Sequence, residues 1–162
     1  LFGLPEGPDV RFHGLPLFEE RFVVAVSPKH PFARQNIVHC REIDGQAYVN
    51  RANCEYADYA SRKLSEQGVM ARRVFSSDRD DWVQAMIRAG MGFGFFPEYS
   101  VTDPDIVARR LIEPDFVRTI MLLTVRGRPH SPAVGAFVRA ARMFDWPGGR
   151  LDPMPKPEVE PA

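Results

Sequence analysis

The sequence predicts an α/β fold in which helices cover the faces of a small parallel sheet. Residues 22–26, Phe-Val-Val-Ala-Val, are apolar without alternation, which is typical of a strand buried on both faces. From residue 47 to 96, strand and helix patterns alternate, and this order predicts two right-handed parallel crossovers. Residues 86–98 combine a helix end, a short strand and a proline stop, an order that indicates a ligand pocket beyond the strand.

The first part of the chain is expected to be mainly extended. Residues 1–9 are rich in Gly and Pro and predict a loop, and residues 10–17 and 21–27 predict two extended segments. Two prolines soon after residue 27 end the second segment, because proline cannot donate to a strand ladder. A short helical turn is expected at residues 40–43.

Alternating elements follow. Strands are expected at residues 47–50, 72–75, 93–96, 106–112 and 119–125, and helices at about 55–67, at 82–89 and from Ser131-Pro132 onward. Asn53 is expected to cap the first helix, and Ser76 and Ser77, with the aspartates after them, are expected to start the second. The apolar residues of the last helix share one face, which we expect to pack on another part of the protein. They are Val134, Phe137, Val138, Ala141 and Phe144.

Composition narrows the class of protein. A chain of 162 residues with 44% apolar and 26% charged residues is close to the globular average and can bury one good core or share two small lobes. Lys plus Arg equals Asp plus Glu, so the chain gains little from releasing counterions off a nucleic acid. No apolar run approaches membrane-spanning length, and because residues 1–20 lack the charged, apolar and small-residue pattern of a leader, no secretion is expected. Cys40 and Cys54 give no disulfide framework and suit a reducing, cytoplasmic compartment.

Several kinds of site are not supported by the motifs. The four histidines and two cysteines lack the close ligand pairs of a zinc site, so no metal is expected. Gly90, Gly92 and Gly94 precede a strand, whereas a dinucleotide loop follows one. No nucleophile set and no carboxylate pair has an evident acid and base assignment. An enzyme is therefore the least supported class, and no cofactor is expected.

Three motifs in a specific order carry a resemblance to a known family. They run from Leu17 to Pro31, from Ile43 to Gln46, and from Ala89-Gly90-Met91-Gly92 to Phe96-Pro97-Glu98. Together they span most of residues 10–145, and in this order they resemble the effector-binding domain of LysR-type transcriptional regulators. The resemblance implies a bilobal, periplasmic-binding-protein-like (type 2) fold, in which two crossover strands hinge two α/β lobes and a small inducer lies between them.

The same resemblance implies one complete lobe and part of the other. Residues 1–31 correspond to part of the first lobe and a crossover strand, and residues 32–120 to the second lobe. Residues 121–146 correspond to the return crossover and the C-terminal helix of the first lobe, and residues 147–162, rich in Pro and charge, to a disordered tail.

The family's helix-turn-helix and the opening of its first lobe are absent from this sequence, which starts without Met, so we expect a truncated chain. DNA would be contacted only through that missing head. Self-association through effector domains, usual in the family, is expected in the full protein.

The expected cleft lies beyond the carboxyl ends of three strands. Its predicted lining is Arg51, Asn53 and Cys54 after the first strand, Phe75, Ser76 and Ser77 after the second, and Phe95 and Phe96 on the third. A helix N-terminus attracts anions, and an arginine can hold a carboxylate with two parallel hydrogen bonds. In the alternative interpretation the Asn and Ser side chains only cap helices, and the Phe side chains belong to the core.

Cys54 introduces a second possible function. Its position near a helix start would stabilise the thiolate and lower the thiol pKa. Peroxide-sensing members of the family place their reactive cysteine at the corresponding turn, but residues 56–67 lack the second cysteine of those members. The main interpretation is a domain that senses a small metabolite. A thiol redox switch at Cys54 and a solute-binding protein of the same fold are the alternatives.

Overall fold

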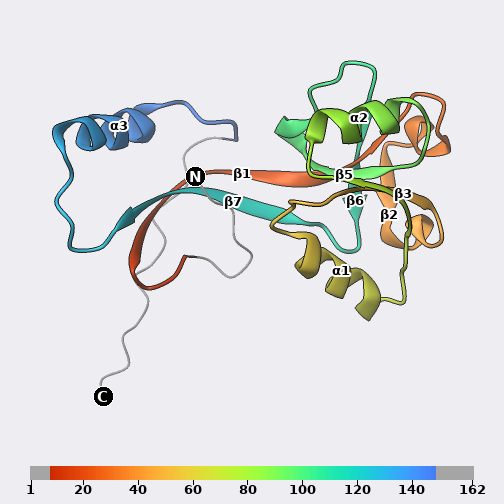
Figure 1. Ribbon diagram of the computed structural model, residues 1–162, viewed down its shortest axis with the longest axis horizontal. Helices are drawn as coiled ribbons and strands as arrows, with labels where there is room; N and C mark the ends of the chain where they lie inside the picture. Colours follow the sequence, from red (N-terminus) through yellow and green to blue (C-terminus); the bar gives the residue numbers. More distant parts are fainter. Residues whose placement is uncertain (1–7, 149–162) are drawn as a thin grey trace. The chain divides into compact units, whose positions relative to one another are not determined.

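The computed structural model describes residues 8–148, and the chain divides into two compact units. Unit 1 consists of Leu1–Glu19 and Thr119–Ala162, and unit 2 consists of Glu20–Arg118. Two long strands belong partly to each unit and lead the chain out of one and into the other (Figure 1). Unit 2 carries most of the sheet and is described first.

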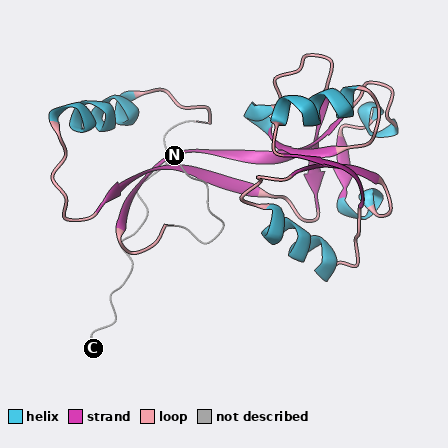
Figure 2. Ribbon diagram, viewed as in Figure 1, coloured by secondary structure: helices cyan, strands magenta, loops and turns pink. Residues whose placement is uncertain are grey.

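The predicted α/β class is confirmed (Figure 2). The strands are β1 (Phe12–Val26), β2 (Ile37–His39), β3 (Ala47–Arg51), β4 (Arg72–Ser77), β5 (Gly94–Pro97), β6 (Val107–Ile112) and β7 (Val117–Val125). The α-helices are α1 (Ala57–Glu66), α2 (Asp80–Arg88) and α3 (Pro132–Met143), and the 3-10 helices are η1 (Pro31–Arg34), η2 (Cys40–Ile43) and η3 (Glu98–Ser100).

The sheet of unit 2 is mixed. Its order is β2-β6-β1-β5, with β2 parallel to β6 and with β1 antiparallel to both of its neighbours in that order. β3 and β4 form a separate parallel pair, which a parallel bridge between Tyr48 and Phe93 joins to the start of β5. The predicted parallel sheet over residues 47–96 is thus right for β3 and β4. The parallel bridge also gives the segment that enters β5 the predicted direction relative to β3, and β5 pairs in addition with β1, antiparallel, which was not predicted.

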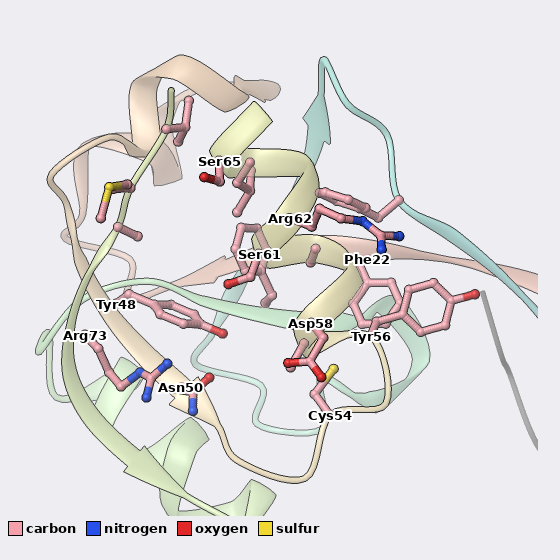
Figure 3. Close-up of a pocket in the computed structure, with 18 of the residues that line it drawn as sticks. Phe22, Tyr48, Asn50, Cys54, Tyr56, Asp58, Ser61, Arg62, Ser65 and Arg73 are labelled. Atoms are coloured by element: carbon pink, nitrogen blue, oxygen red, sulfur yellow. The ribbon is translucent and has the colours of Figure 1, made fainter. Parts of the chain in front are cut away.

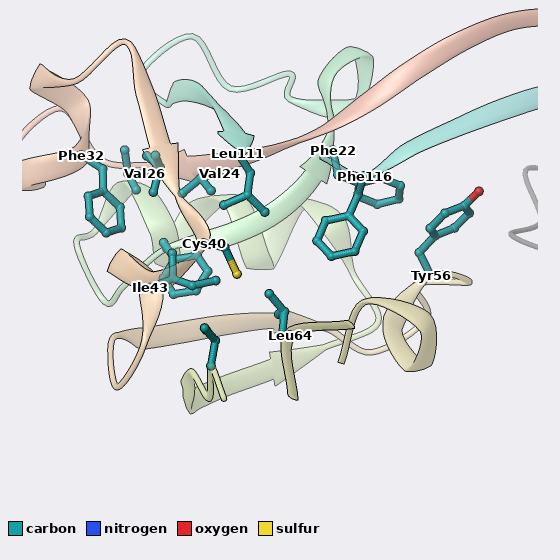
Figure 4. Packing of buried hydrophobic residues seen from close by; sticks show 13 residues of the cluster. Phe22, Val24, Val26, Phe32, Cys40, Ile43, Tyr56, Leu64, Leu111 and Phe116 are labelled. Atoms are coloured by element: carbon teal, nitrogen blue, oxygen red, sulfur yellow. The ribbon is translucent and has the colours of Figure 1, made fainter. Parts of the chain in front are cut away.

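Apolar side chains form one cluster on each face of this sheet. Along β1, Val24 and Val26 point into one cluster, and Val23 and Ala25 into the other, because successive strand residues face opposite sides. The first cluster also contains Leu64 of α1 (Figure 4), and the second contains residues of α2. Figure 1 shows α1 and α2 on opposite sides of the strands. The continuous apolar run of β1 therefore reflects burial on both faces, as predicted.

Three local predictions are corrected. β1 is a single strand, whereas two extended segments were predicted. Asn53 does not cap α1, because residues 52–56 form a turn first and Tyr56 occupies the N-cap position without a side-chain hydrogen bond. Ser77 does not cap α2, because β4 continues through it and Arg79 is the N-cap residue. At residues 18–20 and at Ser77 the strand extends further than local propensity indicated, and at Asn53 a turn separates the strand from the helix.

In unit 1, α3 starts as predicted. The Ser131 hydroxyl accepts a hydrogen bond from the Val134 amide at 3.3 Å, with a proline in the first turn. Of the predicted apolar stripe, only Ala141 is buried, and Phe137 is 58% exposed. Within the described part of the chain, this face of α3 is not covered. The tail predicted at residues 147–162 lies, after its first two residues, outside the described residues.

No α-helix within residues 8–148 combines the length and the apolar character needed to cross a bilayer.

Gly92, two residues before β5, tests how closely the chain approaches β3 at this point. A Cβ added at Gly92 would lie 2.2 Å from the Ala47 carbonyl oxygen, so Gly92→Ala should lower the free energy of unfolding by about 3 kcal/mol. At Gly45, where φ is +67° and no heavy atom lies within 4 Å of the added Cβ, the alanine should cost only about 1 kcal/mol of backbone strain. Denaturant unfolding of both variants measures the difference, and equal losses would contradict this account.

Candidate functional site

The pair β3 and β4 presents two chemically different faces. Val49 and Phe75, aligned with each other, point into the cluster that contains α2. Tyr48, Asn50 and Ser76 point to the other side, toward α1. A register irregularity between Tyr48 and Val49 places Phe75, rather than Val74, opposite Val49. The alternation of β3 thus separates an apolar face from a polar one.

The polar face forms one wall of a pocket of about 910 Å³ within unit 2 (Figure 3). This volume is within the range of roughly 300 to 1,000 Å³ that is usual for small-molecule sites. The opposite wall is α1 with the segment before it, and the remaining lining comes from β1, β5 and residues near 70 and 116. The residues that the site uses most are Tyr48, Asn50, Cys54, Tyr56, Arg62, Arg73, Ser76 and Phe95.

The space exists because α1 faces it with small side chains. Ala57, Ala60, Ser61 and Leu64 all line the pocket, at the spacing that places residues on one face of a helix. Only Leu64 is large and buried. The short side chains of the other three leave the space between α1 and the β3–β4 pair unfilled, so the gap follows directly from the sequence of α1.

Hydrogen-bond donors gather in this pocket. The Asn50 side-chain amide donates to the Ser76 hydroxyl at 3.0 Å, which links β3 to β4 across the polar face. Burial raises the pKa of Tyr48 to about 12, with the nearby Cys54 adding to the rise, so its phenol stays protonated. In Figure 3 its hydroxyl points toward the centre of the pocket. Tyr48 therefore offers a neutral donor.

Two arginines at the pocket are available for a ligand. Among the described residues, neither Arg62 nor Arg73 forms an ion pair, although Arg62 lies over the Tyr59 ring at 5.8 Å. Asp58 is the single carboxylate in the lining. Arginine is matched to carboxylate and phosphate groups by its planar set of donors. The charge and the donors both favour an anionic ligand.

Aromatic rings supply the apolar part of the wall. Tyr48 and Phe95 have ring centroids 5.7 Å apart, and Phe22 and Tyr56 are 5.0 Å apart. Such rings give flat, apolar surfaces against which a ring or hydrocarbon of a ligand packs.

The predicted site residues divide between the two faces. Cys54, Ser76 and Phe95 line the pocket. Phe96 is fully buried and Phe75 packs against the cluster that contains α2.

Arg51 is already occupied. Its Nε and Nη2 donate to the two carboxylate oxygens of Asp80 at 2.7 and 2.9 Å, and its guanidinium lies over the Phe96 ring at 4.9 Å. The two-pronged carboxylate contact predicted for a ligand is made within the protein.

Asn53 and Ser77 lie near the carboxyl ends of the same strands. The Asn53 residue is exposed, and the Ser77 hydroxyl accepts a hydrogen bond from the Arg79 amide at 3.1 Å. The helix starts predicted at residues 53 and 77 lie further along, at Ala57 and Asp80. A role for these two residues, and for Arg51, in ligand binding stays a prediction.

Tyr48, Asn50, Tyr56 and Arg73 line the pocket but were not predicted. The first two could have been found from strand alternation, because residues 48, 50 and 52 of an extended segment share a face. The small residues of α1 are a second signal. Tyr56 and Arg73 depend on how the turn before α1 and the strand β4 are placed, which no local pattern shows.

The surroundings of Cys54 do not favour the lowered thiol pKa that the redox alternative requires. Burial raises the pKa of Cys54, and this effect outweighs the hydrogen bond from the Tyr56 amide and the charge of Arg51, both of which lower it. Burial likewise raises the pKa of Cys40, which belongs to the core. In the part of the chain that the structure describes, no group of three or more His, Cys, Asp or Glu could hold a metal ion.

Comparisons with known proteins give one family and a set of structures with a similar fold. A sequence model of the LysR substrate binding domain matches residues 1–144. The CcmR regulatory domain of Synechocystis PCC6803 in complex with 2-PG is similar, with TM-score 0.74 and 15% identity over 84% of this chain and 68% of that chain. The effector binding domain of QuiR in complex with shikimate has TM-score 0.69 and 20% identity over 81% of this chain and 64% of that chain.

A third similar structure is the reduced form of the OxyR regulatory domain from Pseudomonas aeruginosa, with TM-score 0.67 and 20% identity over 88% of this chain and 71% of that chain. At these identities the likeness shows the fold alone. No curated protein matches the chain.

The raised pKa of Cys54 predicts slow labelling. In a Cys40→Ala background, iodoacetamide should modify Cys54 more slowly at pH 7.5 than in the unfolded chain, because a raised pKa leaves less thiolate. The two rates should converge as the pH rises above the pKa of the folded thiol. Mass spectrometry of timed samples gives the rates. Faster labelling of the folded chain at neutral pH would restore the redox-switch interpretation.

Proposed function

Because the chain belongs to the LysR substrate binding domain family, we propose that it is the effector-sensing domain of a LysR-type transcriptional regulator and that the pocket between α1 and the β3–β4 pair holds its effector. The observation that carries the proposal is the set of donors in this pocket. Two arginines that form no ion pair within residues 8–148 and a protonated tyrosine surround an aromatic-walled space of about 910 Å³.

The proposed ligand is a small organic acid with an apolar or cyclic body. Its acid group would accept hydrogen bonds from Arg73 and the Tyr48 hydroxyl, and its body would pack on the Phe95 and Tyr56 rings. Each charge-assisted hydrogen bond contributes about 1.5 to 3 kcal/mol. Two neighbours of similar fold are described as complexes with 2-PG and with shikimate, which is consistent with a small effector here.

The same proposal covers the whole protein. It acts by binding rather than by catalysis, in the cytoplasm, and it contacts DNA through a helix-turn-helix head outside this sequence. Self-association through effector domains belongs to the same proposal. Family membership supports this function over a solute-binding protein of the same fold. The raised pKa of Cys54 argues against the redox switch.

Substitutions of two neighbouring arginines test whether the pocket binds small acids. Titration calorimetry with shikimate, benzoate and a panel of other small monocarboxylates identifies acids that bind the wild-type chain. Arg73→Met should weaken their binding at least tenfold, because about 1.4 kcal/mol corresponds to a factor of ten. Arg72→Met changes an exposed neighbour that does not line the pocket and should leave the affinity unchanged. Tyr48→Phe, which removes only the hydroxyl, should also weaken binding.

Equal affinities for the two arginine variants would show that the acid binds elsewhere. Binding of the neutral amides of these compounds, with no binding of the acids, would show that the proposed ligand class is wrong.

A further inference from the structure

An ion pair joins the two ends of unit 2. Arg118, the last residue of the unit, lies on β7, and Glu20, its first residue, lies on β1. Nε and Nη2 of Arg118 donate to Oε1 of Glu20 at 2.8 and 2.6 Å. The Glu20 side chain is 4% exposed and that of Arg118 is 12% exposed. At this pair the chain enters and leaves the unit.

The same guanidinium also reaches the pocket wall. Its Nη1 donates to Oε1 of Glu55, which lies in the turn between β3 and α1. The neighbours of Glu55 on either side, Cys54 and Tyr56, both line the pocket. In the part of the chain that the structure describes, no other ion pair involves residues 52–56.

Arg118 also reaches the pocket turn through the aromatic ring of Phe22. The Arg118 guanidinium lies over the Phe22 ring at 5.4 Å, and the Phe22 ring lies 5.0 Å from that of Tyr56. Phe22 itself lines the pocket. Its amide donates to the Phe116 carbonyl at 2.8 Å, close to the start of β7. Arg118 therefore touches the pocket turn through a charge and through an aromatic pair.

The guanidinium makes these contacts dependent on one another. It is planar and rigid, so the directions of its three donor groups are fixed relative to one another. A movement of the turn that displaces the Glu55 carboxylate must tilt the plane or break a contact. Tilting the plane disturbs the contact with Glu20, which is buried and needs its positive partner.

We propose that Arg118 is a positioning residue that couples the pocket turn, residues 52–56, to the strands β1 and β7 where they leave unit 2. A ligand that displaces Tyr56 or Cys54 shifts Glu55, and this shift weakens or rearranges the ion pair between Arg118 and Glu20. This regulation rests on the proposed function of the pocket. The coupling itself is a property of the ligand-free chain, so it is tested without ligand.

Hydrogen exchange of the full chain provides the first test. Glu55→Ala removes one contact of Arg118 at a partly exposed position, so the variant should fold. Exchange of backbone amides in residues 20–23 and 116–119 should rise about fivefold or more, while exchange in α2 should stay unchanged. Asp58→Ala, the matched control, removes a carboxylate from the pocket lining that has no ion pair among the described residues, and it should leave both segments as in the wild type.

Coupling is reciprocal, so a substitution on β1 should change the exposure of the pocket turn. Glu20→Gln should speed the labelling of Cys54 severalfold in the Cys40→Ala background, whereas the exposed neighbour variant Glu19→Gln should not. The proposal is overturned if the exchange of residues 20–23 and 116–119 is unchanged in Glu55→Ala. It is equally overturned if exchange rises uniformly over the whole chain, because that result indicates a loss of global stability.

Discussion

The organisation of unit 2 depends on the alternation of side chains along β3. Val49 anchors the strand in the core beneath α2, and this fixes Tyr48 and Asn50 on the opposite side. A shift of one residue would exchange the two sets, burying an amide and a phenol and exposing a valine. The register is therefore strongly determined by burial. The pocket is the other consequence of the same constraint, because the side chains on the face opposite Val49 carry the polar groups.

The helix α1 decides whether that polar face becomes a site. A helix with large apolar residues at positions 57, 60 and 61 would pack against Tyr48 and Phe95 and close the space. The short side chains keep it open, while Leu64 is buried in the core and Tyr59 packs against the same cluster. Among the described residues, the two arginines at the pocket form no ion pair with a protein carboxylate. In this short helix, Leu64 contributes to the stability of the core, and the small residues leave the space in which a ligand can bind.

Charged residues in this unit have contrasting roles because of their partners. Arg51 donates two hydrogen bonds from one edge of its guanidinium to Asp80, so its charge links β3 to the start of α2. Arg73 is exposed and free of ion pairs among the described residues, so its charge is available to a ligand. Arg118 is nearly buried between two glutamates. Residue type alone indicated anion binding for any of the three, and only the distances separate them.

The sequence by itself determined the α/β class, the position of most elements and the family, because the apolar run of β1, the Gly90 helix end and the Ser131-Pro132 start are local patterns. Tertiary structure decided the antiparallel pairing of β5 with β1, the carboxylate partner of Arg51 and the raised pKa of Cys54. Each of these depends on residues distant in the chain. The pairing needs β1, the partner of Arg51 is Asp80, and the pKa of Cys54 depends on the burial of its turn. A local sequence pattern determines the secondary structure of a segment, and only tertiary packing determines which residues that segment contacts.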